Sequence, residues 1–191
     1  MASSDDPFED VPYPSEYTLL QDLGHLTAEE RDAVGAYTAG AYLDVNEALR
    51  GRRPMTAAVQ QGIEHLRSAL AKFPLPSACR VSRETELEDL GLDAGQSPED
   101  LVGEVLQELG FLSASGLRVP PRIVDRRNPV WLDLVVAAGV PALLITEELT
   151  LASASEREVL LIDARELFDT GVHLHQESGL WVVQAMVIDE E

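Results

Sequence analysis

Apolar side chains in the first half of the chain recur at steps of three and four residues, the spacing that gathers them on one face of a helix. The clearest start is Thr27, which forms a capping box with Glu30. Gly35 and Gly40 lie inside the first periodic stretch and argue against one unbroken helix there. The pattern predicts helices over residues 27–49, 55–72 and 97–109.

From residue 78 onward, short apolar runs separated by turn residues replace the helical spacing. Trp131–Val136 and Ala142–Ile145 flank a Gly-Val-Pro turn, and we expect them to be neighbouring strands. The predicted strands are residues 78–83, 111–115, 131–136, 142–145, 158–162, 165–168, 171–175 and 180–188. Helices that come first and strands that come later are typical of an α+β domain.

Composition agrees with a globular domain, because 45% of the 191 residues are hydrophobic and 25% are charged. Residues 1–17 combine prolines with acidic side chains and are predicted to be a flexible acidic arm, which leaves residues 18–191 as one domain. No apolar run is long enough to cross a bilayer. No Sec-type signal peptide is visible, so we expect a cytoplasmic product or delivery by a non-Sec route.

A net charge of −20 narrows the range of partners. Nonspecific nucleic-acid binding needs a cationic surface that displaces counterions, and anionic membranes repel an acidic protein. The charge therefore argues against both, and it is compatible with a basic protein partner or with a role in solubility.

Two glutamates, Glu156 and Glu158, lie directly before a short apolar run. If residues 158–162 form a strand, side chains two residues apart point to the same side, so both carboxylates can reach one ligand. Such a pair can stabilise developing positive charge with one carboxylate and orient a nucleophile with the other.

This Glu-x-Glu sequence resembles the signature of bacterial ADP-ribosyltransferase toxins and exoenzymes. In that family an arginine, a Ser-x-Ser strand and Glu-x-Glu build one NAD site. Residues 81–83 (Val-Ser-Arg) resemble the arginine strand and residues 110–115 the serine strand, and the motifs come in the family's order. The resemblance covers residues 27–188 and includes similarity to the helix before the arginine strand, at Tyr37-Thr38, Asn46 and Leu49-Arg50-Gly51.

The resemblance implies two antiparallel sheets that meet at an angle, with NAD in the cleft between them. It assigns Arg83 to the NAD pyrophosphate, which a guanidinium can bind with two hydrogen bonds. Arg80 is the alternative, and on a strand it would face the opposite way. Ser113 would support Glu158, and Ser115 would also contact NAD. Ala114 departs from the threonine that is usual at its position, although its side chain would point away from both serines.

A loop rich in arginines occupies the place of the family's phosphate–nicotinamide loop, and Arg122 is the member that we assign to NAD. The arginines of this loop are Arg118, Arg122, Arg126 and Arg127.

By the same resemblance, Glu158 binds the ribose 2′-hydroxyl of NAD and Glu156 receives the acceptor. A glutamate at the first position goes with an arginine acceptor, which predicts an arginine-specific mono-ADP-ribosyltransferase of the toxin or effector kind. Its partners would be NAD, a protein acceptor and an inhibitor or immunity protein. Residues 148–155, the expected recognition turn, lack the aromatic residue often found there. The alternatives are an NAD glycohydrolase, which needs no Glu156, and a catalytically silent acidic protein-binding module.

Other candidate sites are weaker. His173 and His175 would share one side of a strand, but the sequence shows no third ligand at a metal-site spacing, so no metal is expected. Cys79 is the only cysteine and is expected to be a buried thiol. The chain has no glycine-rich phosphate loop of the Rossmann or Walker type.

Overall fold

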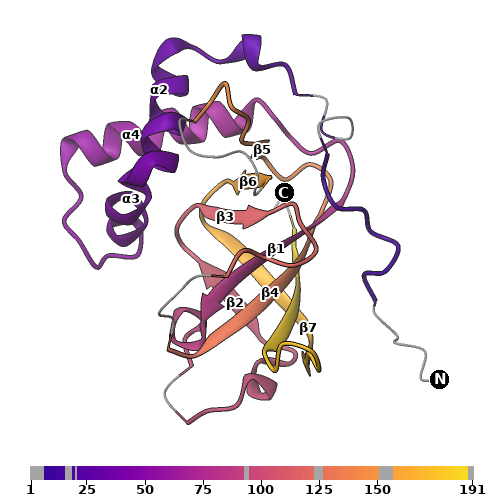
Figure 1. Cartoon of the computed structure of the whole chain (residues 1–191). Helices are drawn as coiled ribbons and strands as arrows, with labels where there is room; N and C mark the ends of the chain where they lie inside the picture. Colours follow the sequence, from indigo (N-terminus) through magenta and orange to yellow (C-terminus); the bar gives the residue numbers. More distant parts are fainter. Residues whose placement is uncertain are drawn as a thin grey trace.

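The structure is a computed structural model and describes residues 7–15, 19, 21–92, 95–122, 127–150 and 157–188. Figure 1 shows the helices gathered at one end of a twisted, strand-rich body. The α+β class predicted from the sequence is therefore confirmed. Within the described residues, no helix has both the length and the apolar character that a membrane span requires.

The helical layer consists of α2 (Ala28–Ala36), α3 (Tyr42–Leu49) and α4 (Ala57–Ala71). The predicted capping box is present, because Glu30 N donates to Thr27 Oγ1 over 3.2 Å and Thr27 N donates to Glu30 Oε2 over 2.8 Å. One π-helical turn, η2 (Tyr37–Ala41), separates α2 from α3, and Gly40 lies there at φ 137°. Residues other than glycine rarely adopt this backbone angle, so the stretch 27–49 is a broken helix.

Eight strands form one hydrogen-bonded sheet in the order β2-β7-β8-β4-β1-β3-β6-β5. The pairs are antiparallel except β4 with β8, which is parallel. The described strands therefore do not form the two separate antiparallel sheets that were predicted. The link between β1 and β3 is a single register pair, Ser82 with Ser115. The strands are β1 (Cys79–Glu86), β2 (Val105–Glu108), β3 (Leu112–Ser115), β4 (Pro129–Val136), β5 (Ala142–Leu144), β6 (Glu158–Leu161), β7 (Arg165–Leu174) and β8 (Trp181–Val187).

The prediction of a helix over residues 97–109 is wrong. Ser97 does cap a helix, but only the short 3₁₀ turn η4 (Pro98–Leu101) follows. Gly103 then turns the chain at φ 83°, and β2 begins at Val105. β2 pairs with β7 along its whole length, so tertiary hydrogen bonding decides the structure of this segment. Two further 3₁₀ turns are η1 (Leu23–His25) and η3 (Leu87–Leu90).

Two predictions about the strands also need correction. β4 and β5 are not neighbours, because β4 lies between β1 and β8 whereas β5 pairs with β6 at the sheet edge. The predicted strands 165–168 and 171–175 are one strand, β7, with a bulge between Asp169 and Gly171. A bulge interrupts the alternation of side chains, which is why the sequence pattern resembles two strands.

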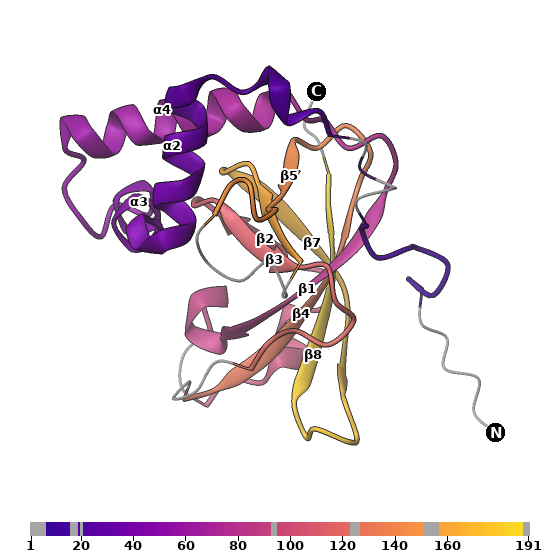
Figure 2. The ribbon, with the colours of Figure 1, turned by 45° about the horizontal axis from the view of Figure 1, so that its top comes forward.

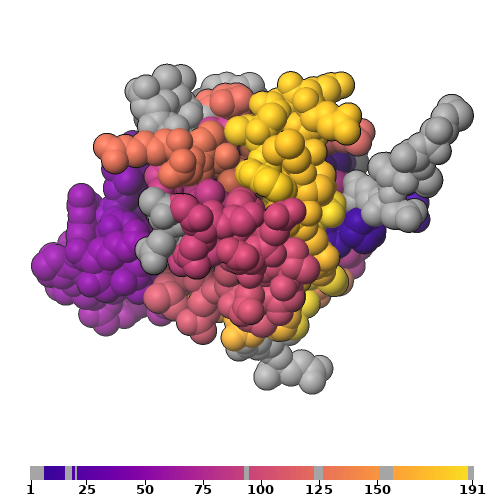
Figure 3. All heavy atoms as spheres, turned by 90° about the horizontal axis from the view of Figure 1, so that it is seen from below, coloured from indigo at the N-terminus to yellow at the C-terminus, as the bar shows by residue number. Residues whose placement is uncertain are grey.

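The segment β5–β6–β3 lies between two hydrophobic cores. Leu143 and Leu160 face the helices, and they belong to the same core as Leu66 of α4 and Phe111. Their strand neighbours face the other way, toward Val81, Leu134 and the rest of the larger core: these neighbours are Leu112, Ala114, Ala142, Leu144, Val159 and Leu161. Figures 2 and 3 show the resulting arrangement, with the helical residues (indigo to purple) on one side of the strands. This alternation fixes which strand residues can face the helices.

Residues 7–15, which composition assigned to the acidic arm, lie against the sheet. Phe8 is buried, and the carbonyl of Pro12 accepts a hydrogen bond from Arg80 N over 2.8 Å. The division of the chain at residue 17 stays a prediction.

Asp169 makes the stability of the fold depend on pH. Burial raises the pKa of this carboxyl from 3.8 to about 6, although Gly171 N donates a hydrogen bond to it. Because the raised pKa favours the protonated form in the folded state, the stability that Asp169 contributes is present below its unfolded pKa and is lost as pH rises through about 6. We expect the free energy of unfolding of Asp169→Asn, taken relative to that of the wild type, to be higher at about pH 7.5 than at about pH 5. Urea unfolding at both pH values measures this change, and Asp32→Asn, at an exposed position of α2, is the control. An equal difference at both pH values would contradict the prediction.

Candidate active site

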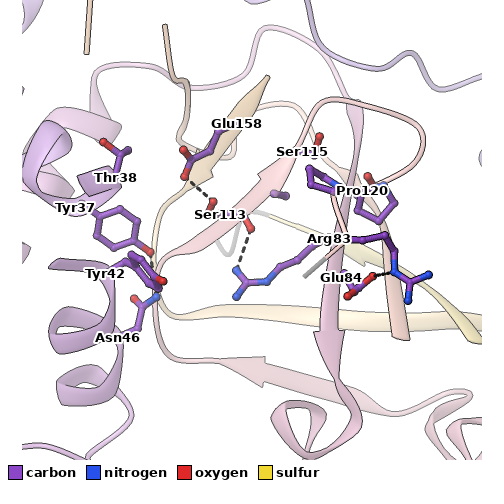
Figure 4. A pocket seen from close by; sticks show the side chains of 14 residues that line it. Tyr37, Thr38, Tyr42, Asn46, Arg83, Glu84, Ser113, Ser115, Pro120 and Glu158 are labelled. Carbon is purple, nitrogen blue, oxygen red and sulfur yellow. Dashed lines mark hydrogen bonds and ion pairs between the residues drawn. The ribbon is translucent and has the colours of Figure 1, made fainter. Parts of the chain in front are cut away.

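A cavity of about 390 Å³ opens between the helices and strands β1, β3 and β6. Figure 4 shows that its side chains come from both layers. Five residues to which the sequence assigned a catalytic or NAD-binding role line it: Arg83, Ser113, Ser115, Arg122 and Glu158. The remaining lining residues are Tyr37, Thr38, Tyr42, Asn46, Ser82, Glu84, Ala114, Pro120 and Pro121. Glu156 and Arg126 lie outside the described residues.

The pairing of β3 with β6 brings the serines and Glu158 to one face. Ser115 is opposite Glu158 and Ser113 is opposite Leu160, so alternation places Ser113, Ser115 and Glu158 on the side of the helices. Ser113 Oγ lies 2.6 Å from a carboxylate oxygen of Glu158 and donates a hydrogen bond to it (Figure 4). The contact predicted between these two residues is therefore present. A hydrogen bond of this kind fixes the orientation of a carboxylate.

Arg83 lies on the other side of Ser113. Its Nη1 donates to the Ser113 carbonyl over 2.9 Å, while the Ser113 hydroxyl binds Glu158. One residue of β3 therefore holds both a cation and an anion at the same cavity, each through a different group. The arrangement offers a fixed positive charge and an oriented carboxylate to one ligand.

Arg80 points to the opposite face of β1 from Arg83, as the alternation of a strand requires, and it does not line this cavity. Its Nε and Nη2 donate to the two carboxylate oxygens of Asp133 over 2.7 and 2.5 Å. Its guanidinium also lies near the Phe8 and Tyr13 rings, at 5.8 and 5.6 Å from their centroids. The Arg80 and Asp133 side chains are 9% and 11% exposed, so this ion pair belongs to the interior of the fold.

The helical wall of the cavity is fixed by Asn46. Its amide donates to the Phe111 carbonyl over 3.2 Å and accepts from Phe111 N over 3.0 Å, so it closes a ring with the backbone at the start of β3. The same amide donates to the hydroxyl of Tyr37, whose pKa burial raises to about 12. Gly110 is required here, because a Cβ atom would lie 2.8 Å from Asn46 Oδ1.

The start of β6 is held by an unusual backbone conformation. Arg157, between the two glutamates of the motif, lies at φ 48°, which is uncommon for a residue other than glycine. Its carbonyl accepts a hydrogen bond from Gly116 N over 2.8 Å. A Cβ atom at Gly116 would lie 3.1 Å from that carbonyl, so the glycine permits the close approach that places Glu158 opposite Ser115.

Tyr42 and Glu84 were not singled out from the sequence, yet both line the cavity. On an unbroken helix Tyr37 and Tyr42 would be about 140° apart. The break at Gly40 brings their rings to 6.2 Å, so the interrupting glycine was the available signal. Glu84 has a side-chain exposure of 0% and pairs with Arg122 Nε over 2.8 Å.

The weaker candidates lie elsewhere. His175 Nδ1 is 2.9 Å from the Ser178 hydroxyl, and its ring lies 4.9 Å from that of Trp131. In the described parts of the chain, no group of three or more His, Cys, Asp or Glu side chains could hold a metal ion. Cys79 is buried, and burial raises its pKa to about 11, which keeps the thiol protonated.

Comparison with known proteins gives two kinds of match. The family model described as ADP-ribosyltransferase exoenzyme matches residues 16–167. Similar solved structures include C3stau2 from S. aureus with NAD, at TM-score 0.74 and 21% identity over 91% of this chain and 92% of that one. Plx2a, an ADP-ribosyltransferase toxin from Paenibacillus larvae, has TM-score 0.75 and 20% identity over the same shares of both chains. The Clostridium limosum C3 exoenzyme has TM-score 0.72 and 18% identity over 85% and 86%. A search of curated proteins finds no match.

The two arginines of β1 should differ in what they do for stability. Arg80→Met leaves Asp133 buried without its cation, so we expect a loss of about 3–5 kcal/mol in the free energy of unfolding. Arg83→Met removes a charged donor from a half-buried carbonyl, with an expected loss of about 1–2 kcal/mol. Urea unfolding of both variants measures the difference. Equal losses would contradict the assignment of Arg80 to the interior and Arg83 to the cavity.

Proposed function

This chain belongs to the ADP-ribosyltransferase exoenzyme family, whose model matches it over residues 16–167, and from that premise we propose that it transfers one ADP-ribose from NAD to an arginine of a protein. Exoenzymes of this family are mono-ADP-ribosyltransferases of the bacterial toxin type, and NAD is their substrate. The choice of arginine as the acceptor, and the roles of individual residues, are our proposal.

The observation that carries the proposal is the Ser113–Glu158 hydrogen bond of 2.6 Å beside Arg83 in one cavity. An oriented carboxylate is needed where positive charge develops during the reaction. A fixed guanidinium is needed where the dinucleotide carries its two phosphates. Both requirements are met by residues that share Ser113 as their support.

The cavity suits a substrate of this class. Its volume of about 390 Å³ lies within the range of small-molecule sites, and Tyr37 and Tyr42 provide aromatic surface on its helical wall. We assign the pyrophosphate to Arg83 and to Arg122, which both line the cavity. Ser113 and Ser115, which also line it, are further residues that we assign to NAD.

The reaction breaks the bond between nicotinamide and C1′ of the ribose. The electron pair of that bond leaves with nicotinamide, and positive charge spreads over C1′ and the ring oxygen, as in glycoside hydrolysis. Glu158, held by Ser113, would bind the ribose 2′-hydroxyl more strongly as this charge grows, which lowers the barrier. A guanidinium nitrogen of the acceptor then bonds to C1′ and gives up one proton.

We assign the acceptor to Glu156 because Glu-x-Glu with glutamate at the first position goes with arginine in this family. Its carboxylate would accept hydrogen bonds from the guanidinium and take the proton that is released. Water in place of the acceptor would give NAD hydrolysis, which requires Glu158 but not Glu156.

Nicotinamide release from NAD tests the proposal. We expect the wild type to release nicotinamide faster when agmatine, a small guanidine, is present. Glu158→Gln keeps the shape of the side chain and removes its charge, so we expect release to fall about 10²–10³-fold with or without agmatine. Release that ignores agmatine would indicate a glycohydrolase, and a wild type that binds no NAD would indicate a silent protein-binding module.

A second variant separates the two glutamates. We expect Glu156→Gln to lose the stimulation by agmatine and to keep the slower hydrolysis of NAD, since hydrolysis does not use the acceptor site. Analysis of the product by mass spectrometry distinguishes ADP-ribosyl-agmatine from free ADP-ribose. Equal losses of transfer and hydrolysis in this variant would contradict a role confined to the acceptor. Glu64→Gln on the exposed face of α4 is the control.

A further inference from the structure

The loop between β3 and β4, whose residues Pro120, Pro121 and Arg122 line the cavity, contacts β1 at three points. Ser82 Oγ donates to the Leu117 carbonyl over 2.7 Å. Glu84 pairs with Arg122 Nε over 2.8 Å. Arg127 N donates to Glu86 Oε1 over 3.1 Å. The contacts follow the same order along both segments, so β1 holds the loop near its start, at Arg122 and near its end.

The three anchoring residues are spaced by two along β1. Alternation therefore places Ser82, Glu84 and Glu86 on one face of the strand, while Arg83 points to the other face. Arg83 reaches across to Ser113 in the cavity. One strand thus supplies a guanidinium to the cavity and, from the opposite face, holds the loop that carries a second guanidinium.

Glu84 makes the one ion pair among these three contacts. Its side chain has an exposure of 0%, whereas that of its partner Arg122 is 60% exposed. A carboxylate buried this deeply needs a cation close by, because an uncompensated buried charge strongly destabilises a fold. Arg122 supplies such a cation, and the ion pair holds this exposed arginine, and with it the loop, close to the strand.

We propose that Glu84 is a positioning residue, which holds Arg122 by its Nε so that the Nη groups of this arginine can bind the pyrophosphate of NAD. The proposal rests on the proposed function, since NAD is the ligand. The ion pair with Glu84 is formed by Arg122 Nε, so the donors on Nη1 and Nη2 lie outside this contact. Pro120 and Pro121, which precede Arg122, form part of the cavity wall, so the ion pair also positions that wall.

A residue that acts in this way changes the binding of NAD more than the chemical step. Pyrophosphate contacts lie away from the bond that breaks, so they stabilise the ground state and the transition state about equally. Loss of such contacts raises KM and leaves kcat nearly unchanged.

The first test compares Glu84→Gln with the wild type. Glutamine keeps the size of the side chain and removes the charge that fixes Arg122. We expect KM for NAD to rise about tenfold and kcat to change less than about twofold. Arg122→Lys keeps the positive charge and lacks Nε, and it should raise KM similarly. If Glu84 acts through Arg122, the double variant should be no worse than either single variant. Glu64→Gln, the same change on the exposed face of α4, should match the wild type.

The second test does not depend on NAD. Trypsin cleaves after arginine, and the anchored loop carries Arg118, Arg122 and Arg127. We expect Glu84→Gln to be cleaved in this loop about tenfold faster than the wild type or Glu64→Gln, with no NAD present. Thermal unfolding confirms that each variant is folded at the temperature of the assay.

Several results would overturn the proposal. A lower KM in Glu84→Gln would mean that Glu84 competes with NAD for Arg122. A loss of kcat without a change in KM would place Glu84 in the chemical step, and additive effects in the double variant would separate it from Arg122. Unchanged KM and unchanged cleavage would remove the role altogether. A wild type that consumes no NAD overturns the proposed function, and the cleavage rates then decide separately whether Glu84 anchors the loop.

Discussion

The site depends on one backbone pairing, Ser82 opposite Ser115, at which β1 meets β3. This pair joins the five strands β2, β7, β8, β4 and β1 to the three strands β3, β6 and β5. Because side chains alternate along both strands, the crossing also decides what each face presents. On β3 and β6 it turns Ser113 and Glu158 toward the helices. On β1 it places Ser82 on the face of Ser115, where Ser82 and Glu84 hold the loop, while Arg83 leaves from the other face and reaches the Ser113 carbonyl at the cavity.

The helices complete the site because polar contacts tie them to the segment between the end of β2 and the start of β3. The Asn46 side chain hydrogen-bonds both the N–H and the carbonyl of Phe111, so neither backbone group is buried without a partner. Arg50, directly after α3, binds Glu108 at the end of β2 with two hydrogen bonds from Nη2, at 3.0 and 2.9 Å. Together with the break at Gly40, these contacts fix the position of Tyr37 and Tyr42 relative to Glu158.

Local patterns in the sequence were sufficient for features that depend on neighbouring residues. The capping box at Thr27, the α+β class and the contact between Ser113 and Glu158 all follow from spacing or from a motif of a few residues. Pairing between distant segments was not predictable in the same way, which is why residues 105–108 form a strand and not the end of a helix. Glu84 was missed for a related reason. The predicted strand ended at residue 83, whereas β1 extends to Glu86, and a carboxylate is expected to be solvent-exposed until its distant partner Arg122 is known.

The net charge of −20 acts in opposite directions on the two proposed substrates. It repels an anionic dinucleotide and attracts a cationic acceptor over distances limited by the Debye length of about 8 Å at physiological salt. NAD binding must therefore depend on cations held close to the cavity. Arg80 cannot serve, because Asp133 neutralises it inside the fold. Arg83 and Arg122 are described cations that line the cavity, and each contacts a neighbour, Ser113 or Glu84, that limits its freedom. We therefore propose that the fixed position of these two guanidinium groups offsets this repulsion and gives the dinucleotide a defined place to bind.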